Sequence, residues 1–145
     1  MKFWDSSAIV PLCLREPSTA AIRALEQSDP SLVVWWATRI ECLSAIVRRS
    51  REAPLDPSAE ADARARLFAL DAGWFEIQPS AALRTTAERL LALHPLRAAD
   101  ALQLAAALDW CEGRTTNVEL VSLDRRLREA ARREGLLVLP AEFTV

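Results

Sequence analysis

Five short apolar runs alternate along the chain with longer stretches whose apolar residues recur at helical spacing. The runs cover residues 2–4, 32–36, 74–77, 119–122 and 136–139. Several are apolar throughout, which is typical of strands covered on both faces, as in a parallel sheet. Helices are predicted between the runs, at about 18–28, 38–51, 57–72, 79–93, 97–111 and 124–134. The alternation predicts one α/β domain with right-handed crossovers.

Proline and glycine positions agree with these boundaries. Asp56-Pro57 is typical of an N-cap followed by proline in the first helical turn. Pro95 is expected to end one helix, and Gly135 to provide a left-handed cap before the last strand. The stretch 51–57 is the best candidate for a mobile loop.

Composition places the chain among single globular domains. Its 145 residues, 51% of them hydrophobic, suffice for one core spanning residues 1–145. No apolar run is long enough to span a membrane, and no signal peptide is visible. The three cysteines lie far apart, so a reducing cytoplasm without disulfides or zinc is expected. Three glycines in total exclude a glycine-rich phosphate-binding loop.

The charged residues are unevenly distributed by type. The net charge is −2, which does not indicate nucleic-acid binding, but 17 of the 18 basic residues are arginine. Arginine suits phosphate because its guanidinium is a planar fork of donors. A genome rich in G and C would produce the same bias without any function. The single histidine, His94, precedes a proline and is expected to be a surface or capping residue and not a ligand.

Three acids stand where predicted strands turn into helices. Asp5 ends the first run, Glu41 lies in the first turns of the helix after the second, and Asp124 follows the fourth. Ligands of open parallel sheets bind outside the carboxyl ends of the strands. These three side chains are therefore expected at one edge of the sheet.

Asp100 completes the group from a different setting. It lies near the start of a helix that is otherwise almost wholly apolar, where a carboxylate needs a partner or a metal. Taken singly, each acid is explained as a cap or by the helix dipole. Four acids at one edge would repel one another, and a divalent cation is the simplest way to keep them ionised. Oxygen ligands without Cys or His favour Mg²⁺ or Mn²⁺, the ions of phosphodiester hydrolysis.

Four segments of the chain, taken in order, resemble PIN-domain ribonucleases, and in particular the VapC toxins of type II toxin–antitoxin pairs. They are Asp5-Ser6-Ser7-Ala8, Glu41-Cys42-Leu43-Ser44-Ala45, the stretch 96–105 around Asp100, and Ser122-Leu123-Asp124-Arg125-Arg126-Leu127. Each segment is short, and the ordered set carries the resemblance. Two residues depart from the family pattern: Gln103 stands where many relatives carry histidine, and Ser122 where threonine is usual.

The resemblance implies a three-layer α/β/α sandwich with a central parallel sheet of four to five strands. It implies a Mg²⁺-dependent endoribonuclease, with Mn²⁺ able to substitute, whose acidic quartet is Asp5, Glu41, Asp100 and Asp124. It also implies RNA as substrate, a cognate VapB-type antitoxin and commonly a homodimer. No association with a membrane is expected, because no apolar run is long enough to span one.

Several other residues have two readings that the sequence leaves open. Ser6 or Ser7 would donate a hydrogen bond to a ligating carboxylate or only cap a turn. Arg97, one helical turn before Asp100, would hold a substrate phosphate or neutralise that acid. A further set of arginines would guide RNA or form a solvated helix face: Arg39, Arg48, Arg49 and Arg51.

One helix face is a candidate for binding a partner. The helix 57–72 carries apolar residues along one side, and with the helix 38–51 it would form a groove for an antitoxin segment. In the alternative, this side packs inside the monomer. The residues are Ala61, Ala65, Phe68, Ala69 and Ala72.

Three other functions compete with a toxin. A phosphoreceiver-like domain would want a lysine beside the acids, but the only lysine, Lys2, lies in the first run. A PIN-like nuclease of RNA processing cannot be told from a toxin by this sequence. A catalytically inactive binding partner would not need the full set of four acids.

Overall fold

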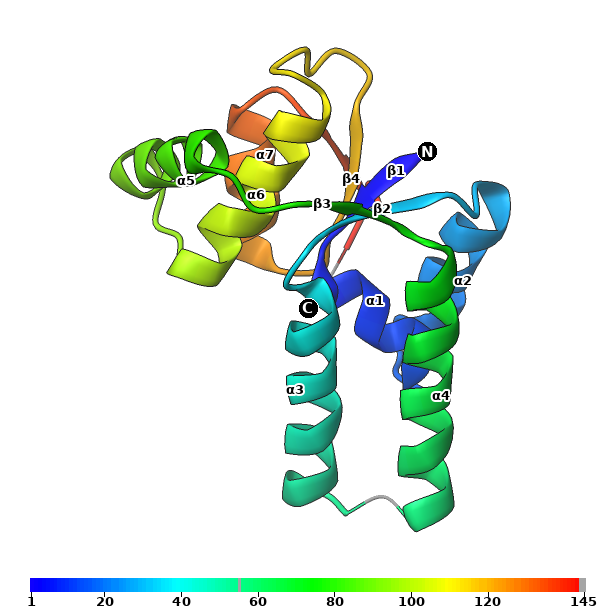
Figure 1. Cartoon of the computed structure of the whole chain (residues 1–145). Helices are drawn as coiled ribbons and strands as arrows, with labels where there is room; N and C mark the ends of the chain where they lie inside the picture. Colours follow the sequence, from blue (N-terminus) through cyan, green and yellow to red (C-terminus); the bar gives the residue numbers. More distant parts are fainter. Residues whose placement is uncertain (55, 144–145) are drawn as a thin grey trace.

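Five parallel strands form the centre of the computed structural model, which describes residues 1–54 and 56–143 (Figure 1). The strands are β1 (Lys2–Trp4), β2 (Leu32–Trp35), β3 (Phe75–Ile77), β4 (Glu119–Val121) and β5 (Leu137–Leu139). They pair in the order β3-β2-β1-β4-β5, with Phe3 between Val33 and Leu120. The predicted strand positions are confirmed to within one residue at each end.

Seven helices connect the strands in the described part of the chain. They are α1 (Ser6–Cys13), α2 (Thr19–Ser28), α3 (Thr38–Glu52), α4 (Pro57–Gly73), α5 (Ala81–Leu93), α6 (Ala98–Trp110) and α7 (Arg125–Arg133). The sequence predicts all of them except α1. This helix is short, contains Pro11 and buries most of its residues, so it shows neither helical periodicity nor an uninterrupted set of good helix formers.

Helices cover both faces of the sheet, which gives the three layers. Along β1, Phe3 points into a core formed with α5, α6 and α7, and Trp4 points into a second core formed with α1 to α4. Both side chains are fully buried. This alternation explains why β1 and β2 read as continuously apolar: both faces of these inner strands are buried.

The predicted caps are in place. The Asp56 side chain accepts a hydrogen bond from the backbone amide of Ala59 at 2.9 Å, with Pro57 in the first turn of α4. Gly135 has a φ of +96°, and a Cβ there would lie 2.7 Å from Thr115 Oγ1. His94 caps the end of α5 as expected but is buried, not on the surface, with Nε2 2.8 Å from a carboxylate oxygen of Glu134.

Helices α3 and α4 extend side by side beyond the sheet as an antiparallel pair (Figure 1). Residues 51 and 52 close α3, so the predicted loop is shorter than 51–57, and its residue 55 lies outside the described residues. The apolar side of α4 does not pack inside the monomer: its core residues are Ala63 and Leu67. The five residues singled out in the sequence are all exposed, namely Ala61, Ala65, Phe68, Ala69 and Ala72.

Two further expectations concern the whole chain. Cys13, Cys42 and Cys111 are all free thiols, as their spacing predicts. Among the described residues, no helix combines the length and the apolar character that crossing a membrane requires.

Candidate metal centre

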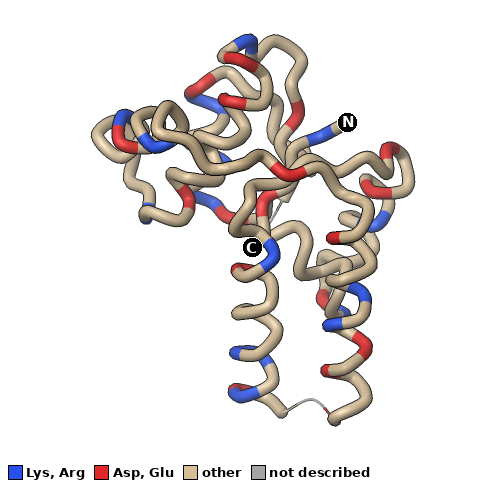
Figure 2. Tube along the Cα trace, in the orientation of Figure 1, with Lys and Arg blue, Asp and Glu red and all other residues tan. Residues whose placement is uncertain are grey.

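All four predicted acids lie at the carboxyl edge of the sheet. Asp5 directly follows β1 and caps α1, and Asp124 follows β4 and caps α7. Glu41 and Asp100 stand in the first turns of α3 and α6. Acidic positions gather at this edge, where α3 begins, with basic positions beside them (Figure 2).

Asp5 is the most enclosed of the four, with 3% of its surface exposed. Its carboxylate accepts hydrogen bonds from the Ser7 hydroxyl, from the Ser7 backbone amide at 3.3 Å and from the Ser122 hydroxyl at 2.9 Å. Ser6 Oγ lies 3.4 Å from Asp5 Oδ1. Burial raises the pKa of Asp5 to about 6, the two serine hydroxyls oppose this rise, and the charges of Asp100 and Asp124 add to it.

Glu41 is held by a residue of the opposite helical layer. The side-chain amide of Gln103, on α6, donates to Glu41 Oε2 at 2.8 Å and lies 3.0 Å from the Thr38 hydroxyl. Burial raises the pKa of Glu41 to about 7, the Gln103 hydrogen bond lowers it, and the charges of Asp5 and Asp100 raise it further. Gln103 thereby joins α3 and α6 across the end of the sheet.

Asp100 is half-buried and stands between charges of both signs. Burial and the charge of Asp124 raise its pKa, whereas the backbone amide and charge of Arg97 and the charge of Arg126 lower it. Arg97 is exposed and forms no ion pair with Asp100 within 4.0 Å among the described residues. Its guanidinium is therefore available to a ligand beside the acids, and the reading that it neutralises Asp100 by direct pairing is not supported.

Asp124 is anchored by its own helix and by the serine pair beneath Asp5. Its Oδ1 accepts from the backbone amide of Leu127 at 2.8 Å. The Ser122 hydroxyl accepts from the Asp124 amide at 3.1 Å, and the Ser7 hydroxyl accepts from the Leu123 amide at 2.8 Å. Ser7 and Ser122 thus fix the β4–α7 junction and the Asp5 carboxylate together.

The four acids share one electrostatic neighbourhood without forming a closed cage. Asp5 and Glu41 each respond to Asp100, and Asp100 responds to Asp124. Within residues 1–54 and 56–143, however, no three carboxylate, histidine or cysteine side chains stand close enough to ligate one ion as they are. Any ion held here would use few direct protein ligands.

The donor chemistry of this edge fits Mg²⁺ or Mn²⁺. Every acidic donor is a carboxylate, and Mg²⁺ characteristically takes only one or two carboxylates and keeps several waters. An additional oxygen, Gln103 Oε1, is buried beside Glu41 without a hydrogen-bond partner in the described structure. Asp5, Glu41, Asp100 and Asp124 are the residues that would hold the ion, directly or through its waters.

The basic residues predicted to accompany the acids are only partly free. On α3, Arg39 pairs with Asp71 at 2.7 Å and stacks on Phe68, and Arg49 pairs with Glu16 at 2.8 Å. Lys2 lies at the opposite edge of the sheet, 3.3 Å from Asp29. It cannot serve the acidic edge, which removes the support for a phosphoreceiver-like site.

Sequence reasoning misses three residues that organise the site. Gln103 and Ser122 appear in the sequence only as departures from a family pattern, and Thr38 is not singled out at all. All three are fully buried polar side chains. The available signal was their position: Ser122 immediately follows β4, Thr38 opens α3 three residues after the end of β2, and Gln103 interrupts an apolar helix one turn after Asp100.

Comparison with known proteins identifies the fold. The family model described as "PIN domain" matches residues 2–133. No curated protein sequence matches the chain closely enough to count as a relative.

Several solved structures share the fold at low sequence identity. PAE2754 from Pyrobaculum aerophilum has a TM-score of 0.66 and 19% identity, covering 95% of this chain and 83% of that one. FitAcB from Neisseria gonorrhoeae has a TM-score of 0.67 and 13% identity over 97% and 98% of the two chains. VapC20 of Mycobacterium tuberculosis, described as a toxin that cleaves the sarcin-ricin loop, has a TM-score of 0.65 and 17% identity over 90% and 95%.

Proposed function

Because the chain belongs to the PIN domain family, we propose that it is a Mg²⁺- or Mn²⁺-dependent endoribonuclease whose centre is the acidic edge of the sheet. One observation carries the proposal: four acids from four separate segments of the chain lie at the carboxyl edge, and burial and their mutual charges raise the pKa of three of them. Such a cluster destabilises the fold unless a cation compensates its negative charge. Its presence therefore indicates selection for binding a cation.

Some of these side chains would bind the ion, and others orient the side chains that bind it. Asp5 and Asp100 are the main ligands, Glu41 is a third, and Asp124 completes the set or holds a water of the ion. A bound divalent ion would supply a polarised phosphate and a water of lowered pKa. Ser7 and Ser122 fix the orientation of the Asp5 carboxylate, and Gln103 fixes that of Glu41.

Arg97 and Ser6 are proposed to contact the substrate. Arg97 is exposed at the start of α6, one turn from Asp100, where a guanidinium would pair with a phosphate adjoining the cleaved bond. Ser6 is half-buried beside Asp5 and presents the one hydroxyl of the first turn of α1 that is not committed to the β4–α7 junction.

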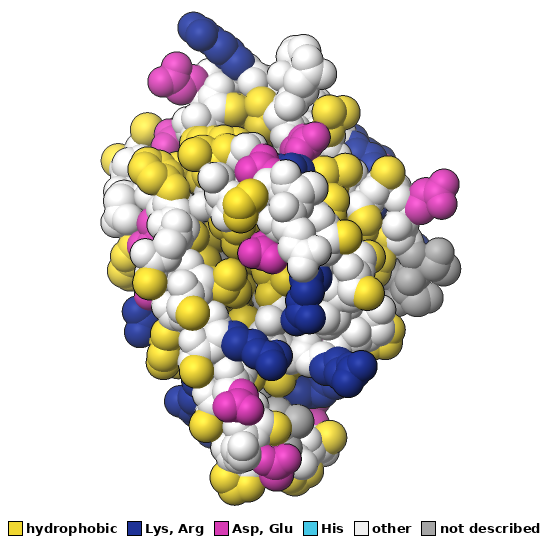
Figure 3. Space-filling model, turned by 90° about the vertical axis from the view of Figure 1, so that its right-hand side faces the viewer, with side chains coloured by type: hydrophobic (Ala, Val, Ile, Leu, Met, Phe, Trp, Pro, Cys, Tyr) yellow, Lys and Arg dark blue, Asp and Glu magenta, His cyan; other side chains and the backbone are white. Residues whose placement is uncertain are grey.

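A toxin role with an antitoxin partner is the finer part of the proposal. It is supported by the likeness of fold to VapC20 and by the exposed apolar surface of the α3–α4 pair. At and just before the start of α3, Ile40 is 62% exposed and Trp36 53%, so both add large exposed apolar side chains. Next to the apolar side of α4, hydrophobic side chains that include Ala69 gather in a hollow of the face that α2 and α4 present (Figure 3).

These surfaces suit an apolar segment of a VapB-type antitoxin, and a homodimer would cover part of them. Expression of the chain alone should arrest growth, and expression together with the neighbouring gene product should restore it. Normal growth together with metal-dependent RNA cleavage in vitro would favour an RNA-processing nuclease instead. The nuclease itself is tested by incubating purified protein with labelled RNA in EDTA and after adding back Mg²⁺ or Mn²⁺.

A further inference from the structure

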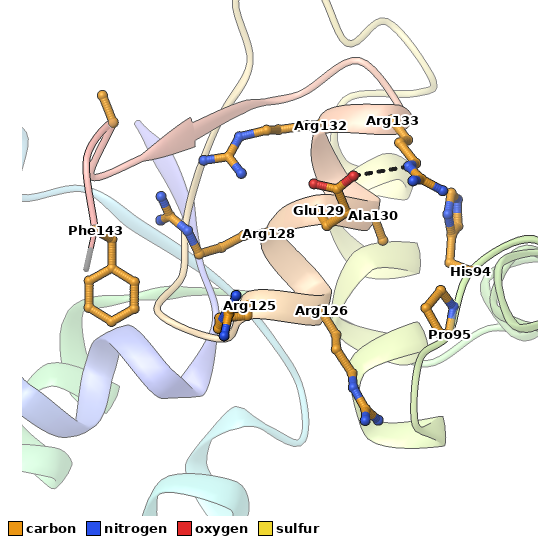
Figure 4. Close-up of a pocket in the computed structure, with 11 residues that line it drawn as sticks. His94, Pro95, Arg125, Arg126, Arg128, Glu129, Ala130, Arg132, Arg133 and Phe143 are labelled. Atoms are coloured by element: carbon orange, nitrogen blue, oxygen red, sulfur yellow. Dashed lines mark hydrogen bonds and ion pairs between the residues drawn. The ribbon is translucent and has the colours of Figure 1, made fainter. Parts of the chain in front are cut away.

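Helix α7, the C-terminal segment and the turn at His94 line a cavity of about 630 Å³ that is open to solvent and rich in arginine (Figure 4). Five of its lining residues are basic: Arg125, Arg126, Arg128, Arg132 and Arg133. In the close-up, Arg128 and Arg132 extend from α7 in the direction of Phe143, and Arg133 extends in the direction of His94. The proposed catalytic roles use none of these side chains.

The acids near this cavity are already engaged. Glu129 pairs with Arg133 at 3.2 Å, and Glu134 pairs with Arg89 at 2.9 Å. Glu134 also lies 2.8 Å from His94. In the part of the chain that the structure describes, no carboxylate lies within 4.0 Å of the guanidinium groups of Arg125, Arg126 and Arg132. The cavity therefore carries a surplus of positive charge.

Three of the arginines form a stripe along one face of α7. Arg125, Arg128 and Arg132 are spaced i, i+3 and i+7, so the two exposed ends of the stripe lie about 10 Å apart along the helix axis. Arg128, between them, is buried and donates to the carbonyl oxygens of Ser122 and Pro140, each at 2.7 Å. Burial and the charge of Arg132 lower the pKa of Arg128, as expected where cations crowd without an anion.

The stripe is continuous with the acidic centre. Helix α7 starts from its cap, Asp124, so Arg125 and Arg126 follow an acid of the centre directly in the chain. The charge of Arg126 also lowers the pKa of Asp100. A chain of phosphates leaving the acidic edge would reach Arg125 first and Arg132 two helical turns later.

We infer that this arginine face of α7 binds the phosphate backbone of single-stranded RNA on one side of the cleaved bond. The RNA assignment rests on the proposed function, since direct continuity with Asp124 in the chain and the effect of the Arg126 charge on Asp100 distinguish this basic surface from others. Guanidinium groups pair with phosphate through two parallel hydrogen bonds and read no base, so the contact positions the strand without selecting a sequence. It also offsets the repulsion between the RNA and the acidic edge.

The test compares two double variants with the full-length wild type. Arg125→Gln/Arg132→Gln removes both exposed ends of the stripe and leaves the buried Arg128 in place. The control, Arg23→Gln/Arg114→Gln, removes the same charge from exposed positions of α2 and of the loop before β4. Binding of a fluorescein-labelled 20-nucleotide single-stranded RNA is followed by anisotropy in EDTA, across a series of salt concentrations, so that no cleavage occurs.

The stripe variant should bind the RNA on the order of tenfold more weakly than the control variant. The slope of log Kd plotted against log salt concentration should also be shallower by about 1.4, because each of the two lost phosphate contacts contributes about 0.7. A slope and Kd equal to those of the control variant would overturn the inference. The inference would also be overturned if wild type bound a decaglutamate peptide more tightly than the RNA and the stripe variant lost this peptide binding. That result would assign the face to an acidic protein.

The two proposals fail in different ways. If wild type does not cleave RNA with added metal but the stripe variant still loses affinity and slope, the endonuclease assignment is wrong and the RNA-binding face stands. If wild type cleaves RNA and the stripe variant keeps the slope of the control, the face is wrong and the endonuclease stands.

Discussion

Asp5 sits almost completely out of water between two serine hydroxyls and two acids. The hydrogen bonds from Ser7 and Ser122 favour its charged form, but burial outweighs them and the pKa rises to about 6. A carboxylate in this setting is poorly stabilised by the protein alone. The surrounding hydroxyls hold its orientation, and a cation would have to supply the missing charge.

Removing the Gln103 amide should raise the pH at which the enzyme becomes active. In Gln103→Leu, Glu41 loses the hydrogen bond that lowers its pKa, and a bond to a charged group contributes about 1.5–3 kcal/mol, equivalent to roughly one pH unit or more. The pH–rate profile of Mn²⁺-dependent cleavage should move up by about one unit. The exposed Gln27→Leu serves as control, and an identical profile in both variants would show that Gln103 does not set the charge of Glu41.

Relieving repulsion at Asp100 should stabilise the metal-free protein. Asp100→Asn keeps the shape of the side chain and removes a charge that raises the pKa of both Asp5 and Glu41. We expect the melting temperature in EDTA to rise by a few degrees, given that about 1 kcal/mol corresponds to roughly 2–4 °C in a domain of this size. Glu88→Gln, on the exposed side of α5, controls for loss of one charge. A melting temperature at or below that of wild type would argue against a shared acidic cluster.

The sequence predicts the position of the acids better than that of the residues that hold them. Asp5, Glu41 and Asp124 stand out because acids rarely follow buried strands without a reason, and Asp100 stands out on an apolar helix. Gln103, Thr38 and Ser122 do not stand out, because a neutral polar residue gives no charge signal and its partner comes from a distant part of the chain. The hydrogen bond from Gln103 to Glu41 spans 62 residues.

At the scale of elements, periodicity predicts what is amphipathic or long and misses what is short and buried. Helix α6 is recognised by its length and α4 by its cap, although α4 turns its alanine-rich side outward. Helix α1 has no exposed polar face to reveal it, since most of its residues are buried and Pro11 lies inside it. Whether an apolar helix face packs inward depends on the neighbouring elements, and the sequence of α4 alone does not contain that information.

In addition to its core residues, one buried arginine ties helix α7 to the ends of β4 and β5, and replacing this arginine should destabilise the fold. Arg128 donates to the backbone carbonyls of Ser122, Leu139 and Pro140, which no single lysine ammonium can reproduce in the same geometry. Arg128→Lys should lower stability by about 2–3 kcal/mol and the melting temperature by several degrees. Arg132→Lys, an exposed neighbour on the same helix, should change little. Equal melting temperatures for the two variants would contradict this role of Arg128.

For the whole molecule, parallel order turns four distant acids into neighbours. Asp5 follows the central strand β1, Asp124 follows the adjacent β4, and Glu41 follows β2 on the other side. The order of the strands was not predicted, because the sequence shows that strands are buried but not which strand pairs with which. Asp100 reaches the same edge from α6 and not from a strand end, and only packing of α6 against the sheet places it there.

This arrangement should make the metal-free protein less stable as the pH rises from about 4.5 to 7.5. The folded pKa values of Asp5 and Glu41, about 6 and about 7, exceed the ordinary values, so the folded state binds more protons than the unfolded state in this window. The raised pKa of Asp5 alone corresponds to about 3 kcal/mol at most. The lowered pKa values of Asp29 and Glu134 act below this window and at its lower end, where they increase stability as the pH rises.

Urea unfolding in EDTA at pH 4.5, 6 and 7.5 measures this dependence, and Asp5→Asn should flatten it. Stability that increases across the window in wild type would contradict the raised pKa values. Added Mn²⁺ should stabilise the protein more at pH 7.5 than at pH 5.5, because the ion requires ionised carboxylates.

In the proposed function, the acidic edge cuts RNA with the help of a divalent ion. The most direct measurement is the cleavage rate of labelled single-stranded RNA with Mn²⁺ for wild type, Asp5→Asn, Asp100→Asn and the exposed control Glu88→Gln, each shown by circular dichroism to be folded. We predict that wild type and Glu88→Gln cleave RNA at the same rate with Mn²⁺ and that neither protein cleaves RNA in EDTA. Both aspartate variants should lose at least a hundredfold in rate, on the order of 3 kcal/mol of transition-state stabilisation. Folded aspartate variants that cleave as fast as wild type would contradict a catalytic role for the acidic edge.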